Sequence, residues 1–127
     1  MAKIGQDATF YQNNTVTLRF TAVDEDTVGE PALDITSYRV FYALSRYSSS
    51  GTPLTASPVI DRDSTDDPAI VVKTVPASGV VEVRLTNALT NIAARDYYQE
   101  LELVDGLGNR VVCATGNVTI LPNVVNA

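Results

Sequence analysis

The sequence DYYQELELVDGLGNRVVC, residues 96–113, alternates apolar and polar side chains on both sides of a short polar segment. Leu101 and Leu103 alternate with glutamates, which is the period-two pattern of a strand with one buried face and one solvent face. Residues 105–109, Asp-Gly-Leu-Gly-Asn, tolerate the positive φ angles that a tight hairpin loop requires. The segment therefore predicts two antiparallel strands joined by a hairpin, and it indicates an all-β module.

The same alternation recurs along the rest of the chain, between polar segments rich in Gly, Pro, Asn and Asp. The further strands are predicted at residues 9–12, 15–23, 38–45, 69–75, 80–86 and 116–120. About seven or eight short strands with regular turn signals predict an antiparallel two-sheet sandwich with Greek-key links. The inward-facing positions give the expected core: Val16, Leu18, Phe20, Val40, Tyr42, Val83, Leu85, Leu101, Leu103, Val111, Val118 and Ile120.

The length of 127 residues predicts a single domain, residues 1–127, which is large enough to bury a core without disulfides. Three segments are expected to lie outside the sandwich: an N-terminal arm at residues 1–6, a long loop at 46–67 and a C-terminal tail at 122–127. A loop as long as 46–67 is unusual in a compact domain. We expect it to contain a short strand near residues 58–60 or to be a functional excursion.

The composition excludes several classes of site. The chain has no histidine, so neither a Ser-His-Asp triad nor a histidine-containing zinc site can form. The only cysteine, Cys113, falls in an alternating strand and is expected to be a buried apolar side chain. The net charge of −6 and the scattered basic residues argue against a nucleic-acid partner. With no signal peptide and no long apolar segment, we expect a cytoplasmic protein with no membrane partner.

One cluster of acidic residues is a candidate metal site. The carboxylates Asp61, Asp63, Asp66 and Asp67 have a spacing that suggests calcium, but the required glycine and closing glutamate are absent. A solvated acidic loop is the preferred interpretation, and we expect no metal, no cofactor and no catalytic residue. Paired carboxylates can hydrolyse glycosides, but here they fall in loops, so an enzyme is not expected.

The tyrosines divide between core and surface. Tyr38, Tyr42 and Tyr97 fall on inward faces, whereas Tyr47 and Tyr98 are the better candidates for an interface. Gln99 also falls on the inward face of its strand. We expect its amide to bond the backbone of a neighbouring loop, because an unpaired buried amide costs about 1–3 kcal/mol.

Several motifs resemble a known family. The sequence LTNIAARDYY, residues 89–98, resembles the corner of immunoglobulin-like domains in which a tyrosine hydroxyl reaches back to the backbone. The usual disulfide and core tryptophan are missing, so the chain does not resemble a true antibody-type domain. The order of motifs along the chain resembles a small immunoglobulin-like domain of tailed-bacteriophage virion proteins. It is similar to the N-terminal domain of baseplate upper proteins and to stand-alone phage structural proteins. The motifs lie at residues 4–12, 17–21, 33–36, 96–101, 104–109 and 115–122.

The resemblance implies a non-enzymatic virion protein that is assembled in the bacterial host cytoplasm. We expect a capsid decoration or cement protein that binds between capsomers and stabilises the shell. A tail, neck or baseplate adaptor is the alternative within the virion, and a carbohydrate-binding or host-adhesion module is the alternative outside that class. The expected partner is the major capsid protein or another virion protein, and self-association is also open.

The interface is expected on the arm, the long loop, the tail and one strand tyrosine. We also expect the domain to fold without residues 2–6. The candidate interface residues are Ala2, Lys3, Ile4, Gly5, Gln6, Tyr47, Ser48, Leu54, Tyr98, Asn123, Val124 and Val125.

Overall fold

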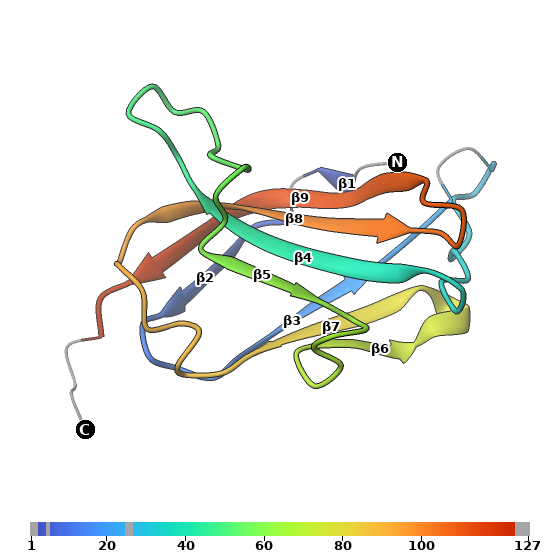
Figure 1. The fold of residues 1–127 in the computed structure, drawn as a ribbon, viewed down its shortest axis with the longest axis horizontal. Helices are drawn as coiled ribbons and strands as arrows, with labels where there is room; N and C mark the ends of the chain where they lie inside the picture. Colours follow the sequence, from blue (N-terminus) through green and yellow to red (C-terminus); the bar gives the residue numbers. More distant parts are fainter. Residues whose placement is uncertain (1–2, 5, 25–26, 124–127) are drawn as a thin grey trace.

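The computed structural model describes residues 3–4, 6–24 and 27–123, which form two β-sheets packed face to face (Figure 1). The larger sheet has the order β1-β9-β8-β4-β5, with β2 also paired to β9, and the smaller sheet has the order β3-β7-β6. A short 3-10 turn, Pro76–Ser78, joins β6 to β7. The strands are β1 Lys3–Ile4, β2 Ala8–Tyr11, β3 Val16–Thr21, β4 Arg39–Arg46, β5 Ile60–Asp63, β6 Val71–Val75, β7 Val80–Leu85, β8 Asp96–Val104 and β9 Arg110–Leu121.

The strand order confirms the predicted fold class, an all-β immunoglobulin-like sandwich. The second, fifth and fourth strands of such a sandwich form one sheet, and the third, sixth and seventh form the other. Here the first of these sheets is formed by β3, β7 and β6, in that order. The other sheet contains β4, β8 and β9, again in that order. Pairing is antiparallel throughout, except that β1 and β2 run parallel to β9. Both N-terminal strands therefore join the larger sheet.

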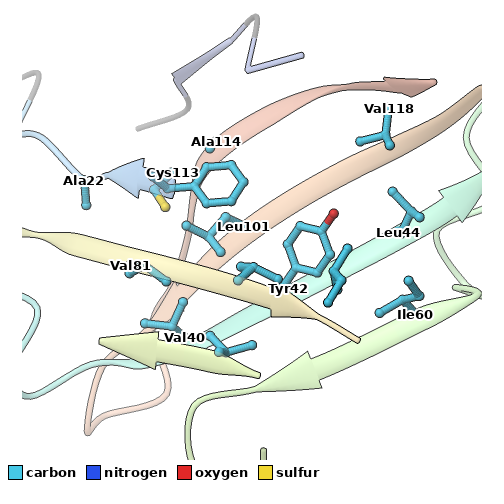
Figure 2. Close-up of a cluster of buried hydrophobic side chains, with 14 of the residues drawn as sticks. Ala22, Val40, Tyr42, Leu44, Ile60, Val81, Leu101, Cys113, Ala114 and Val118 are labelled. Atoms are coloured by element: carbon cyan, nitrogen blue, oxygen red, sulfur yellow. The ribbon is translucent and has the colours of Figure 1, made fainter. Parts of the chain in front are cut away.

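The core lies between the sheets, where Tyr42, Leu101 and Val118 converge with side chains of the facing sheet (Figure 2). The structure confirms most of the expected core but corrects three positions. Val16 and Leu18 are only partly buried, because they lie on β3 at the edge of the smaller sheet. Val111 is 38% exposed. Val111 does point to the core side of β9, as predicted, because it pairs with the buried Leu103. It stays exposed because β1 and β2 pair with β9 only from Ala114 onward.

A β-bulge sets the register of the hairpin. Leu101 pairs with Ala114 and Glu102 pairs with Val112, so Cys113 is an extra residue on β9. Both Cys113 and Ala114 are buried. The expectation that Cys113 is buried is therefore confirmed, and burial raises the pKa of its thiol to about 12.

The predicted tyrosine corner is present. The Tyr97 hydroxyl donates a 2.6 Å hydrogen bond to the carbonyl of Ala93, and the side chain is buried. Thr90 N–H donates to the carbonyl of Thr86, so the segment before the corner contains one helical turn. The corner fixes the path by which the chain crosses from the smaller sheet to β8.

Tyr97→Phe should lower the free energy of unfolding by about 1–2 kcal/mol, because the buried Tyr97 side chain loses its hydrogen bond to the Ala93 carbonyl. Tyr98→Phe is the matched control, since its hydroxyl bonds Glu100 at a partly exposed position. We expect that variant to change stability by less than about 0.5 kcal/mol. Chemical denaturation of both variants measures the difference, and equal losses would show that the corner is not a stabilising contact.

Two of the segments expected outside the sandwich differ from prediction. The described part of the N-terminal arm does not extend away, because Lys3–Ile4 pairs with β9 and Gln6 N–H donates to the Thr115 carbonyl. The expectation of a free arm is therefore wrong for these residues. The long loop does contain a short strand, as predicted, but β5 begins at Ile60. Within the described residues, no helix has the length and apolar character needed to cross a membrane.

Candidate interaction surface

The segment between β4 and β5, residues 47–59, projects beyond the sandwich at the upper left of Figure 1. We call it the excursion. Its first half is a small hairpin, in which Tyr47 bridges to Pro53 and Ser48 N–H donates to the Thr52 carbonyl at 2.7 Å. Gly51 has a φ of 85° at the tip, which favours glycine over residues with a Cβ. The excursion is therefore a hydrogen-bonded structure.

Two tyrosines at the base of the excursion form one cluster with Asn117. The rings of Tyr47 and Tyr98 pack edge to face, with centroids 6.5 Å apart. The Tyr47 hydroxyl donates to Asn117 Oδ1 at 3.0 Å, and the Tyr98 hydroxyl donates to Glu100 Oε2 at 3.1 Å. Burial and the neighbouring Glu100 carboxylate raise the pKa of Tyr98 to about 12. Both hydroxyls therefore stay protonated and serve as fixed donors at neutral pH.

A hollow of about 340 Å³ lies between the excursion and the outer face of the larger sheet. The ring of Phe41 lies on this face, with the guanidinium carbons of Arg39 and Arg110 4.8 and 5.5 Å from its centroid. These cations explain why an aromatic side chain is tolerated on an outward face. The lining residues are Phe41, Ala43, Thr55, Ala56, Pro58, Asp61, Glu100, Glu102 and Arg110.

In the acidic segment at the end of β5, Asp63 belongs to a structural ion-pair network, whereas Asp61 and Asp66 are exposed, as expected of a solvated loop. Asp63 is 8% exposed, and Arg39 binds it through Nε and Nη2, each at 3.1 Å. The same Nη2 also pairs with Asp66 at 3.1 Å. Asp63 accepts the backbone N–H groups of Thr65 and Asp66 as well. In the described part of the chain, no group of three acidic or cysteine side chains is arranged to hold a metal ion.

The ion pair predicts an acid-labile contribution to stability. The Arg39 guanidinium, with two backbone N–H groups, lowers the pKa of Asp63 from 3.8 to about 2. Because the folded pKa lies below the unfolded value, the contribution is complete above about pH 4 and is lost as the pH falls towards about 2. Asp63→Asn should remove roughly 1–2 kcal/mol at neutral pH, since Arg39 is partly exposed and screened.

The measurement is urea denaturation of Asp63→Asn and of Asp61→Asn at neutral pH and at about pH 3. Asp61 lies on the same strand but is exposed, so it is the matched control. We expect the difference between the two variants to shrink at the lower pH. A difference that persists unchanged at about pH 3 would contradict the assigned pKa.

A buried polar chain connects the core to the N-terminal segment. The Tyr42 hydroxyl donates to Gln99 Oε1 at 2.9 Å, and Gln99 Nε2 donates to the Gln6 carbonyl. This confirms the prediction that the Gln99 amide bonds a neighbouring loop. Burial raises the pKa of Tyr42 far above its usual value. Gly116 lies beneath Gln6, where any Cβ would collide with the Gln6 carbonyl.

The structure brings only part of the predicted interface together. Tyr47, Ser48 and Tyr98 lie at the base of the excursion, and Leu54, which is 42% exposed, lies on it. The Asp7 carboxylate accepts the N–H of Asn117, so the segment after Gln6 adjoins the tyrosine cluster.

The remaining candidates lie elsewhere or are not described. Lys3 and Ile4 pair along β9, and Asn123 is bonded to the side chain and carbonyl of Gln12. Ala2, Gly5, Val124 and Val125 lie outside the described residues.

Sequence reasoning missed the hollow and its charged lining. The one available signal was Phe41, whose position on a nominally outward face indicates that something covers it. Arg110 could not be assigned to this site from the sequence. It pairs with Glu102 across the hairpin, and that contact depends on the register after the bulge.

Comparison with known proteins finds only weak structural likenesses. The sequence matches no protein-family model and no curated protein. Among solved structures, CopC from Methylosinus trichosporium OB3b is similar over 97% of this chain and 90% of its own, with 12% identity and a TM-score of 0.44. Murine CRIg is similar over 93% and 92%, with 13% identity and a TM-score of 0.39. These likenesses carry no argument about function, and the fold assignment rests on the strand order.

Proposed function

We propose that the chain is a non-enzymatic structural protein of a tailed-bacteriophage particle, and that it decorates the capsid between capsomers. The virion part of the proposal is supported by the order of sequence motifs, which resembles immunoglobulin-like domains of such particles. The tyrosine corner at Tyr97 and the hairpin after Val104 are features of the immunoglobulin-like fold on which such a protein would be built.

The single observation that carries the binding role is the excursion. A hydrogen-bonded segment extends beyond the sandwich, with Leu54 exposed on it and two tyrosines packed at its base. Tyrosine is among the residue types that are enriched in protein interfaces. A rigid segment also loses less conformational entropy on binding than a disordered arm would lose.

A structural role accounts for three titratable groups with displaced pKa values, which would otherwise suggest a catalytic site. Asp63 is held by Arg39, Tyr98 by Glu100, and Cys113 is buried in the bulge. Each of these groups thus has a partner or a buried environment that serves the fold. Structural ion pairs perturb pKa values as catalytic sites do, so a structural reason removes the need for a catalytic one.

Shell stabilisation would follow from mass action. A protein that binds the assembled lattice but not the free capsid subunits shifts the equilibrium towards the lattice. Because each particle presents many equivalent sites, modest affinity at each junction is sufficient. Tyr47 and Leu54 would then contact the capsid, while the sandwich holds the excursion in place.

The proposal is tested by adding purified protein to particles that lack it and measuring co-sedimentation with heads. Leu54→Asp should weaken binding roughly ten-fold or more, as expected when an apolar contact residue becomes charged. Leu107→Asp is the matched control, because Leu107 is 89% exposed on the β8–β9 hairpin at the opposite end of the sandwich (Figure 1). Equal binding by both variants, or binding to tails alone, would contradict the proposal.

A further inference from the structure

The smaller sheet ends in a strand with an open backbone edge. Ala22 N–H donates to the Gly79 carbonyl at the end of the β3–β7 ladder. Since antiparallel strands alternate the direction of their backbone groups, residues 16, 18 and 20 face β7 and residues 17, 19 and 21 face outwards. Among the described residues, no backbone group bonds the outward groups of Thr17, Arg19 and Thr21.

The chain leaves this edge open because its N-terminal strands pair elsewhere. The first strand of an immunoglobulin-like sandwich can lie beside the second, but here both β1 and β2 pair with β9. Gly116 admits the Gln6 carbonyl against β9, and Gln99 bonds that carbonyl from the core. The edge of β3 is thus open because these contacts hold the N-terminal segment on the other sheet.

The edge lacks most of the features that prevent strand addition. The sequence of β3, VTLRFT, contains no proline, glycine or lysine, and its ladder has no bulge. Its one charge, Arg19, has a side chain that is 63% exposed. In an antiparallel pair of two β3 strands centred on this residue, Arg19 would face its own copy, which is unfavourable. The edge is therefore poorly suited to self-pairing.

A hollow of about 190 Å³ opens beside the same edge, between the two sheets. The apolar residues of its lining are Ala8, Leu18 and Phe20, and the polar ones are Gln6, Asp7, Thr17, Arg19 and Gln99. Leu18 and Phe20 point inwards from β3, so a strand added to β3 would direct alternate side chains into this hollow. The intervening side chains of the added strand would point to the outer face of the sheet, beside Arg19.

The charges on the outward face favour an acidic residue on the added strand. Glu82 is shared by two cations, Arg84 at 2.8 Å and Arg19 at 3.7 Å. The shorter contact belongs to Arg84, so the Arg19 guanidinium is only weakly paired. A carboxylate opposite Arg19 would form a cross-strand ion pair, and opposite charges in such positions stabilise a sheet.

We propose that β3 is a β-addition site that takes an extended segment of a partner protein, with an acidic residue opposite Arg19 and apolar residues on either side of it. The backbone of the segment pairs with the outward groups of β3, and the apolar residues enter the hollow. This inference is independent of the virion assignment, because it rests on the edge and not on the excursion.

The probe is a short synthetic peptide with glutamate at its centre, valines beside it and threonines outside. Added to the ¹⁵N-labelled protein, it should slow amide exchange of Thr17, Arg19 and Thr21 roughly ten-fold or more at saturation. A peptide of the same composition with valine at the centre and glutamate moved one position should not, because its charge would face the hollow.

Charge reversal makes the test specific. Arg19→Glu should weaken binding of the glutamate peptide roughly five- to thirty-fold, and a peptide with lysine at the centre should restore it. Arg95→Glu, an exposed charge reversal before β8, should have no effect. The proposal is overturned if the three amides are unchanged at millimolar peptide, or if both peptides protect them equally. It is also overturned if they are protected in concentrated protein alone, which would make a second copy the occupant.

Discussion

Gly116→Ala should lower the free energy of unfolding by about 2–5 kcal/mol, among the largest effects of a single methyl group in this chain. The added Cβ would collide with the carbonyl of Gln6, which is backbone and cannot rotate away. The N-terminal segment must then move off β9. Gln99, which is 2% exposed, would lose the acceptor for its amide. Overpacking and an unpaired buried amide each cost about 1–3 kcal/mol.

Gly106→Ala is the matched control, because no atom lies within 4 Å of a Cβ at that position and its φ is not in the left-handed region. We expect a change of less than about 0.5 kcal/mol. Urea denaturation gives the free energy of both variants. Amide exchange at Gln6 should also quicken in Gly116→Ala, because the Gln6 N–H loses its hydrogen bond to the Thr115 carbonyl. Equal stability of the two variants would show that the N-terminal segment is not held by this contact.

Leu101→Ala should lower the free energy of unfolding by about 2–5 kcal/mol through loss of buried area and formation of a cavity. Leu101 is 1% exposed on β8, and it lies between Tyr42 on β4 and Ala114 on β9 in the strand register. Leu107→Ala is the control for side-chain size, because the hairpin leaves Leu107 89% exposed. A loss under about 1 kcal/mol for Leu101→Ala would show that the register of β8 is wrong.

Sequence reasoning predicted the elements whose signals are local. The alternation around Leu101 fixed the face of β8, and Asp105 to Asn109 fixed the hairpin, whose first carboxylate accepts the N–H groups of Leu107 and Asn109. The tyrosine corner was predicted from the resemblance of residues 89–98 to the corner of immunoglobulin-like domains. Each of these features involves residues that are close in the chain, so the local sequence pattern is enough to predict it.

What the sequence could not supply are the contacts between distant residues. Arg39 reaches Asp63 across 24 positions, and Gln6 reaches Gln99 across 93. The spacing of Asp61, Asp63, Asp66 and Asp67 describes only their place along the chain. Whether a carboxylate is solvated or buried against a cation depends on the neighbouring strand, and β4 supplies that cation here.

The N-terminal arm illustrates the same limit with a direct consequence. Its small and polar residues resemble a free end, so its removal was expected to leave the domain folded. The structure places the Gln6 carbonyl on a buried amide and pairs Lys3–Ile4 with β9. Deleting residues 2–6 is therefore expected to destabilise the domain, and such a deletion does not separate a binding role from a structural one. Substitutions on the excursion, such as Leu54→Asp, do make that separation.

The central claim, decoration of a phage capsid, is tested most directly by quantitative mass spectrometry of purified intact particles. The ratio of this chain to the major capsid protein gives its copy number in each particle. Decoration of the shell predicts hundreds of copies, because every junction of a given type in the lattice is equivalent. About six or twelve copies, the number set by a symmetric ring in the tail or neck, would contradict decoration and favour the adaptor. Absence of the chain from the particles would contradict the virion assignment itself.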